Sequence, residues 1–416
     1  MGFCPPNIRN SNVEGIITTE KDDRVQNVSI NLVNSGLNEV KTDIEGKYSF
    51  LQLPNGQSVT VSPSKTDGWL NGVSTADIVK IQRHILGLEP LSTAYKMIAA
   101  DVNRSKSITA KDISDLRRLI LGVTNDVPGN TSWRFVHQLY SFNDVTNSLN
   151  ENFPESYEIN GLTTDMKLDF YAIKTGDVTN NALTKGFGNS TTRSNKTLEL
   201  ETPEQQLEVG QTGEVVIKVK NGSDYEGMQF TIQWDSRKLD LEGVEGNTAI
   251  RVRDDNYSTQ HAAEGKLTFS YNGPMTNGEW ILKLKYKAKQ NIRMSESLVV
   301  NSGITPAVSV VKASGEEGQV VMNFAGMSEQ EFVVMQNEPN PWTQETTIGM
   351  MLPQAGEVQI SIYDLAGKIQ LKERVEMKKG YNEYQLSNAK ISQAGVYYYQ
   401  IDYQSNTVTK KMIITE

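Results

Sequence analysis

A stretch of twelve residues occurs twice in this chain, and this repeat constrains the fold more than any other feature. ADIVKIQRHILG at residues 76–87 aligns with KDISDLRRLILG at residues 111–122, at a constant offset of 35. In each copy apolar residues recur at helical spacing, and a glycine follows the last of them, as is common after a helix C-terminus. The apolar stripes are Ile78, Ile81 and Ile85, then Ile113, Leu116 and Ile120. The duplication predicts two similar helices at residues 75–86 and 110–121.

A loop rich in oxygen side chains, DVNRSKSITAKD, stands immediately before the second helix at residues 101–112. Oxygen side chains fall at loop positions 1, 3, 5, 9 and 12, and position 7 would offer its backbone carbonyl. In that order these residues are Asp101, Asn103, Ser105, Thr109 and Asp112, with Ser107 at position 7. Ca²⁺ takes about six to eight oxygen ligands, and this spacing supplies them. We therefore expect Ca²⁺ as a cofactor; the alternative is a polar turn whose side chains cap the helix.

The duplicated helix with its loop, closed by I-L-G in both copies, resembles the dockerin family, type I-like. The resemblance implies two calcium loops packed pseudo-symmetrically and a helix face that docks into a cohesin. The first loop, TDGWLNGVSTAD at residues 66–77, departs from the pattern because positions 1, 3 and 5 are Thr, Gly and Leu. Its remaining candidate ligands are Asp67, Ser74 and Asp77. We expect this first loop to bind calcium more weakly than the second.

The same resemblance implies which residues contact a protein partner. They lie at loop positions 10, 11, 17 and 18: Thr75, Ala76, Gln82 and Arg83 in the first copy, then Ala110, Lys111, Arg117 and Arg118 in the second. We take Gln82, Arg83, Arg117 and Arg118 as candidate partner-binding residues; the alternative is a solvated, charged helix face.

A third fragment repeats the start of a calcium loop. GDVTNNA places Asp177, Thr179 and Asn181 at the spacing of positions 1, 3 and 5. Because no helix follows, an ordinary turn is the better interpretation of this fragment.

The rest of the chain reads as β-structure with period-2 alternation. Residues 12–64 resemble a transthyretin-like, carboxypeptidase-regulatory β-sandwich through the pattern from Thr42 to Gly56. We expect the dockerin-like module at 65–125, an irregular aromatic-rich arm at 126–183 and a linker at 184–197. The predicted fold class is mainly β: tandem β-sandwich domains, Ig/transthyretin-like and cohesin-like jelly-roll, with one small α-helical calcium module.

Residues 198–325 alternate over several strands and resemble a cohesin-like β-sandwich. The segment opens with LEVGQTGEVVIKVKNGSDYEGMQFTIQWD and continues to ILKLKYKA. Trp234 and Trp280 could form a sugar-stacking platform, but their alternation with other large apolar residues favours a place in the core. A chain that resembles both halves of a dockerin–cohesin pair implies a contact between them, either within one chain or head-to-tail between chains. The linker, about fifteen residues, would span roughly 20–23 Å and favours the contact within one chain.

The last 85 or so residues carry the most specific resemblance. QNEPNPW, the strand VQISIYDLAGK, the GVYYYQ strand and the terminal KKMI resemble, in order, the type A sorting domain of the type IX secretion system. The resemblance implies an Ig-like domain at 330–416 and a contact with the secretion machinery through residues 332–416. It also implies a Bacteroidetes source, Sec export before passage of the outer membrane, and a place outside the cell or on the outer-membrane surface.

Composition limits the classes of partner. The chain of 416 residues has a formal charge of −9 and no long basic run, which argues against nucleic acid and anionic membrane as partners. No apolar run approaches the roughly 18 residues that a membrane-spanning helix needs. The start has no secretory signal, so we expect Met1 to open a fragment or a processed form. The single cysteine, Cys4, cannot form an intramolecular disulfide.

The sequence carries no motif of a known catalytic class, and its three histidines are scattered over three segments. We therefore expect no enzyme activity in these residues. The favoured function is a non-catalytic, calcium-stabilised structural or adhesive surface protein, with self-assembly through dockerin-like and cohesin-like contacts as one mode. The alternative is the accessory region of a secreted glycan- or protein-degrading enzyme whose catalytic domain lies upstream.

Overall fold

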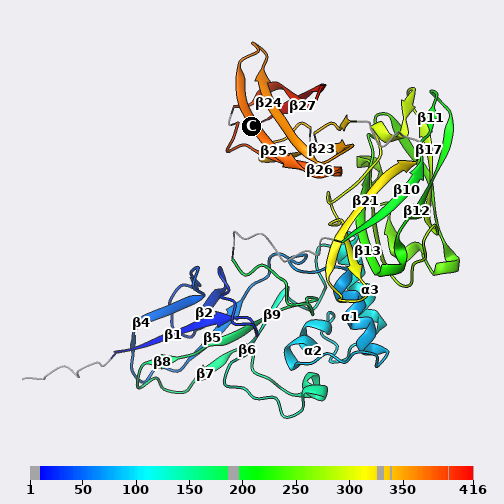
Figure 1. The fold of residues 1–416 in the computed structure, drawn as a ribbon. Helices are drawn as coiled ribbons and strands as arrows, with labels where there is room; N and C mark the ends of the chain where they lie inside the picture. The colour runs from blue at the N-terminus through cyan, green and yellow to red at the C-terminus, as the bar shows by residue number, and fades with distance from the viewer. Residues whose placement is uncertain (1–9, 186–195, 326–331, 338–339, 392, 416) are drawn as a thin grey trace, which may run out of the picture.

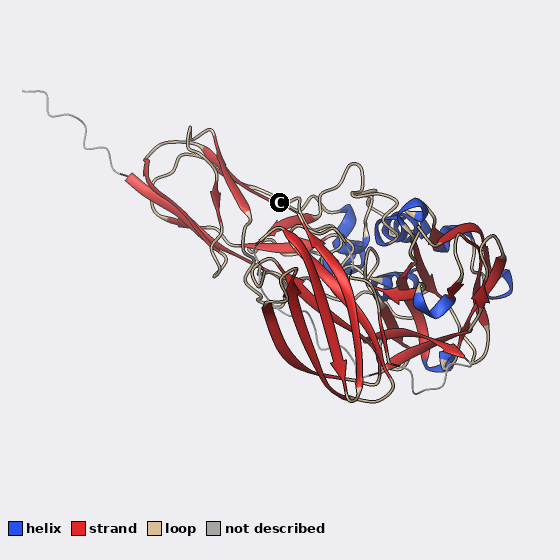
Figure 2. Ribbon diagram, turned by 90° about the horizontal axis from the view of Figure 1, so that it is seen from above, coloured by secondary structure: helices blue, strands red, loops and turns tan. Residues whose placement is uncertain are grey.

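The computed structural model describes residues 10–185, 196–325, 332–337, 340–391 and 393–415. Cys4 and most of the expected linker lie outside these residues. The molecule is mainly β (Figure 2), and the α-helices of the described residues lie between residues 75 and 120. An N-terminal β-domain, a small helical module, a large β-sandwich and a C-terminal β-domain follow along the chain (Figure 1). Among the described residues, no helix is both long enough and apolar enough to cross a membrane.

The N-terminal domain packs two sheets, with strand orders β4-β1-β9-β6 (β8 added beside β1) and β3-β2-β5-β7. Alternate side chains of β1 and β4 are buried, as the period-2 pattern predicts. The strands are β1 (Asn10–Thr18), β2 (Ser29–Val33), β3 (Val40–Lys41), β4 (Lys47–Pro54), β5 (Val59–Ser64), β6 (Trp133–His137), β7 (Tyr157–Ile159), β8 (Met166–Lys167) and β9 (Phe170–Lys174).

Residues 126–183 do not form a separate arm. They supply β6 to β9 and one 3₁₀ turn, η1 (Val145–Asn150). Their aromatic and aliphatic side chains, among them Trp133, Phe135, Ile159 and Phe170, join the core of the N-terminal strands. The helical module is therefore an insertion between β5 and β6, because the chain leaves the N-terminal β-domain and returns to it.

The helical module contains α1 (Thr75–Ile85), α2 (Ala94–Ala100) and α3 (Ala110–Ile120). The sequence predicted α1 and α3 within one residue, whereas the short α2 carries too little pattern to be seen. Both repeated helices begin with a capping box, Ser74 with Asp77 and Thr109 with Asp112, which fixes their first turns. Their inward stripes meet at Ile78, Ile81 and Leu116 in a shared core.

The large sandwich has a ten-stranded sheet, β14-β17-β12-β10-β21-β20-β13-β16-β15 with β19 beside β13, and the separate pair β11-β18. Trp234 lies in its core, while Trp280 is half-buried with the Lys283 ammonium 4.4 Å from its ring centre. The strands are β10 (Thr197–Pro203), β11 (Gln206–Leu207), β12 (Thr212–Val219), β13 (Tyr225–Gln233), β14 (Leu239–Gly246), β15 (Tyr257–Ser258), β16 (Lys266–Asn272), β17 (Trp280–Ala288), β18 (Ile292–Arg293), β19 (Val299–Asn301), β20 (Val308–Val311) and β21 (Glu317–Ala325). Short 3₁₀ turns connect them: η2 (Gly222–Asp224), η3 (Thr248–Ile250), η4 (Asp254–Asn256), η5 (Ala262–Glu264) and η6 (Met294–Glu296).

The C-terminal domain packs the sheet β22-β23-β26 on the sheet β25-β24-β27-β28. Its last strand pairs along its whole length with β27 and buries Met412 and Ile414. The strands are β22 (Val333–Val334), β23 (Glu345–Leu352), β24 (Gly356–Asp364), β25 (Ile369–Met377), β26 (Gly380–Ser387), β27 (Gly395–Tyr403) and β28 (Asn406–Ile414).

Candidate functional site

The helical module lies against the large sandwich, on the face formed by β13, β16 and β20 (Figure 1). Helix α1 contacts all three strands, and α3 contacts the turn η4. We call this contact the latch; it comprises α1, the C-terminal half of α3 and the sandwich residues that touch them.

The apolar centre of the latch is small and closely packed. Ala76 and Val79 of α1 meet Val310 of β20, and each of the three is at most 5% exposed. Gly227 of β13 makes this approach possible, because a Cβ there would lie 3.0 Å from both Thr75 Cγ2 and Val310 Cγ2. Helix α1 therefore packs directly against the backbone of β13 at Gly227.

Around this centre the first turn of α1 donates hydrogen bonds to buried polar groups of the sandwich. The Thr75 amide donates to Gln229 Oε1 at 2.6 Å, and its hydroxyl lies 2.9 Å from the Ser270 hydroxyl. The Ser74 hydroxyl donates to Glu317 at 2.6 Å. Gln229 and Ser270 are fully buried, so separating the two parts would leave these groups exposed or unpaired.

Charged side chains surround these contacts. Arg83 donates to Glu226 at 2.7 Å, and Arg117 donates to Asp255 at 3.2 Å and to Asn272. Burial lowers the pKa of the Arg117 guanidinium, and the Asp255 carboxylate opposes that shift. Asn272 also donates to Gln82 at 2.7 Å, which joins the two helices to one strand.

The C-terminus of α3 also ends on the sandwich. The last carbonyls of a helix have no partner within it. Here the carbonyl of Ile120 accepts from the Thr305 hydroxyl at 2.6 Å, and that of Leu121 accepts from the Thr268 hydroxyl at 2.7 Å. The sandwich therefore caps this helix.

Three of the four candidate partner-binding residues, Gln82, Arg83 and Arg117, lie in the latch, whereas Arg118 is exposed. The two helix copies do not dock equivalently. Where α1 presents Thr75, Ala76 and Val79, the aligned residues of α3 are Ala110, Lys111 and Ser114, all exposed. The receiving side chains belong to no sequence motif; they are Glu226, Gln229, Ser270, Asn272 and Glu317. The sequence signal that could have indicated them is the alternation of polar residues with core residues along β13 and β16.

The candidate calcium loop at residues 101–112 brings its oxygen side chains together. Both carboxylates are buried: Asp101 is 1% exposed and Asp112 fully covered. Asp101 accepts from the amides of Ser105 and Lys106 at 2.8 and 2.9 Å, and the Ser105 hydroxyl lies 3.0 Å from that of Ser107. Two carboxylates with neutral oxygens around them fit the preferences of a hard divalent cation.

The remaining loop residues serve both the loop and the helix. Asp112 accepts from the amides of Asn103 and Thr109, at 3.2 and 2.8 Å, so one carboxylate joins the start of the loop to the helix cap. Burial raises the pKa of Asp112, and its hydrogen bonds oppose the shift. Across the described parts of the chain, no group of three or more His, Cys, Asp or Glu side chains is placed to hold a metal ion.

The candidates of the first loop are separated. Asp67 has a 72% exposed side chain and pairs with Lys65 at 3.0 Å. Ser74 and Asp77 form the capping box of α1, and the Asp77 carboxylate accepts from the amides of Val178 and Thr179 at 2.9 and 3.0 Å. The structure thus brings the fragment at residues 177–182, rather than Asp67, to the start of α1.

Two family models match parts of the chain. A cohesin domain matches residues 197–321, and a secretion system C-terminal sorting domain matches residues 339–415. Neither domain is catalytic, and together they make the chain a modular protein with a cohesin-like module. The sorting domain indicates export to the cell surface or the extracellular space. No curated protein matches the chain.

Several solved cohesin structures are similar to part of the chain. The seventh ScaB type I cohesin from Pseudobacteroides cellulosolvens is 17% identical, covers 32% of this chain and 97% of its own, and gives a TM-score of 0.24. The sixth cohesin of scaffoldin B from Acetivibrio cellulolyticus, in complex with a dockerin, is 16% identical, with coverages of 30% and 98% and a TM-score of 0.23. A type I cohesin–dockerin complex from Clostridium thermocellum is 11% identical, covers 31% of this chain and 100% of its own, and gives a TM-score of 0.25.

Proposed function

We propose that this chain is a non-catalytic structural or adhesive protein of the bacterial surface, in which the dockerin-like helical module closes onto the chain's own cohesin-like sandwich. The observation that carries the proposal is the latch, which combines an apolar centre, buried hydrogen bonds and flanking ion pairs. A contact of this kind within one chain holds the N-terminal β-domain and the sandwich as one rigid unit. Rigidity over several domains suits a protein that spaces or anchors others at a surface.

The latch has consequences for assembly. Because α1 covers β13, β16 and β20, a dockerin-like module of another chain would have to displace it from that face. The tethered helix has the advantage of a high effective concentration. We therefore propose a monomer rather than a head-to-tail filament, with the sorting domain engaging the type IX secretion machinery during export.

We further propose that Ca²⁺ bound by Asp101, Asn103, Ser105, Ser107 and Asp112 stabilises the helical module. Asp112 lies in the first turn of α3, the helix whose C-terminus is capped by the sandwich, so a cation at this end would also support the latch. The loop at residues 101–112 supplies two carboxylates and several neutral oxygens. For such a site we expect a dissociation constant for Ca²⁺ on the order of 10⁻⁵ to 10⁻³ M.

Calcium at a hundredfold excess over its dissociation constant is expected to add about 2.7 kcal/mol of apparent stability, because only the folded loop gathers the ligands. The measurement is a thermal melt of the purified chain in Ca²⁺ and in chelator. Asp101→Ala should remove the part of the response that this loop contributes.

The matched control is Asp67→Ala, which removes an exposed carboxylate of the same module. We expect it to leave the calcium response intact. Identical melting curves in Ca²⁺ and in chelator would contradict the proposal.

A further inference from the structure

Two buried carboxylates meet where α1 begins. Asp77 is fully covered and Asp177 is 2% exposed, although they stand 100 residues apart in the chain. Each charge raises the cost of the other, and burial raises the pKa of both carboxyl groups. The buried Lys174 ammonium beside them lowers the pKa of Asp177, but it donates its hydrogen bonds to the carbonyls of Trp69 and Thr175, at 2.9 and 3.2 Å, so a single ammonium faces two carboxylates. Charges buried in this way are usually compensated by a cation.

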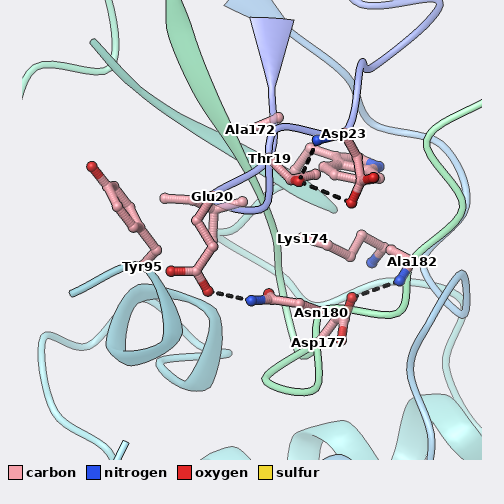
Figure 3. Close-up of a pocket in the computed structure, with 11 residues that line it drawn as sticks. Thr19, Glu20, Asp23, Tyr95, Ala172, Lys174, Asp177, Asn180 and Ala182 are labelled. Carbon is pink, nitrogen blue, oxygen red and sulfur yellow. Dashed lines mark hydrogen bonds between the residues drawn. The ribbon is translucent and has the colours of Figure 1, made fainter. Parts of the chain in front are cut away.

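The segment after Asp177 has the arrangement of the loop after Asp101. Asp177 accepts from the amide of Ala182 at 2.8 Å (Figure 3). It also accepts from the amide of Asn181 at 3.0 Å, and Asp101 accepts in the same way from Ser105 and Lys106. Asp77 accepts from the Thr179 amide at 3.0 Å, as Asp112 accepts from Asn103 at 3.2 Å. The fragment interpreted as an ordinary turn therefore meets a helix after all, but the helix precedes it in the chain.

A neutral oxygen of this segment has no partner. The Oδ1 atom of Asn181 is buried and accepts no hydrogen bond from the residues that the structure describes, while the amide of the same residue donates to Asp177. An unpaired buried acceptor is costly, and an amide oxygen in the same turn as a buried carboxylate is the kind of group that ligates a hard cation.

We propose a second Ca²⁺ site that is discontinuous in sequence, in which Asp177, Thr179 and Asn181 supply the first half of the loop and Asp77 of α1 supplies the closing carboxylate. It differs from a continuous loop because its two halves are far apart in the chain, with the rest of the helical module and β6 to β9 between them. The proposal uses none of the ligands of the continuous loop; it shares with the proposed function the cation and helix α1.

Such a site would tie the latch to the N-terminal domain. Asp77 belongs to the same helical turn as Ser74 and Thr75, which donate to the sandwich. The segment is held in place by Asn71, whose side chain pairs with the backbone of Leu183 in both directions at 2.8 Å. A cation here would hold the chain just before residues 184–197 against the first turn of α1.

The test is calcium titration calorimetry on the full chain, with Ca²⁺ alone as the probe. Wild type is expected to bind two equivalents. Asp177→Asn, which keeps the shape of the side chain, should bind one, and so should Asp101→Asn. Asp67→Asn should still bind two. Asn181→Ala should weaken the second site at least tenfold while circular dichroism shows an unchanged fold.

The outcomes separate the two sites. If wild type binds one equivalent, and only Asp101→Asn abolishes it, the discontinuous site is overturned and the continuous loop stands. If only Asp177→Asn abolishes a single equivalent, the discontinuous site stands and the continuous loop fails. Two equivalents retained by Asp177→Asn and Asn181→Ala, both folded, would also overturn the proposal.

Discussion

An Ala76→Lys variant is expected to open the latch. Ala76 is 1% exposed between Val79 and Val310, and lysine is the residue that the aligned position of α3 carries. Burying an ammonium without a partner costs about 3–5 kcal/mol, which lowers the ratio of closed to open molecules by more than about a hundredfold. Small-angle X-ray scattering should report a larger radius of gyration. The helix itself should persist, because lysine is a good helix former.

The control for this variant is the other copy of the repeat. Lys111 is exposed, so Lys111→Ala should leave the scattering curve unchanged. A compact Ala76→Lys protein would show that the apolar centre does not hold the two parts together. Light scattering on the same samples should report a monomer for wild type, with and without calcium.

Removal of residues 332–416 is expected to abolish export, and the protein should accumulate in the periplasm of its own host. The sorting domain match ends at residue 415, and β28 closes the sheet with Met412 and Ile414 in the core. Loss of β28 alone (Asn406–Ile414) should therefore have nearly the same effect. Immunoblots of periplasm, outer membrane and medium measure the distribution.

A reporter fusion separates a sorting signal from a folding requirement. Residues 332–416 attached to a periplasmic reporter should carry the reporter out of the cell. Efficient export of the truncated chain, or retention of the fusion, would mean that this domain is only a further structural module.

The two repeated helices, the strands of the large sandwich and the C-terminal domain follow from local patterns in the sequence, which is why they could be predicted. Ile78, Ile81 and Leu116 repeat at helical spacing, and Asp77 and Asp112 stand at the third position after a capping hydroxyl. The alternation of β13 and β17 similarly predicts a sandwich. Each of these signals lies within a dozen residues.

Other features depend on contacts between distant segments. Strands β6 to β9 are two to five residues long, too short for a period to emerge, and β9 gains its place by pairing with β1 about 150 residues earlier. The approach of Asp177 to Asp77 is of the same kind. Motif spacing assumes a continuous loop, so it pointed to Asp67, which lies on the surface.

The contact between α1 and the sandwich could be predicted in part from the sequence and depends in part on the packed structure. The dockerin resemblance pointed to Thr75, Ala76, Gln82 and Arg83, but it gave equal weight to the second copy. The choice of α1 follows from Ala76 and Val79, which have small apolar side chains where α3 has Lys111 and Ser114. It also requires Gly227 on the facing strand, whose role depends on the packed structure.

Disulfide trapping tests the latch most directly. The hydroxyls of Thr75 and Ser270 lie 2.9 Å apart, so cysteines at these two positions, in a chain with Cys4→Ser, should form a bond within one molecule. We predict loss of both free thiols and faster migration on a non-reducing gel, whereas the pair Lys111→Cys with Ser270→Cys should stay reduced. Two free thiols in the first pair, or disulfide-linked dimers in place of a cross-linked monomer, would contradict an intramolecular latch.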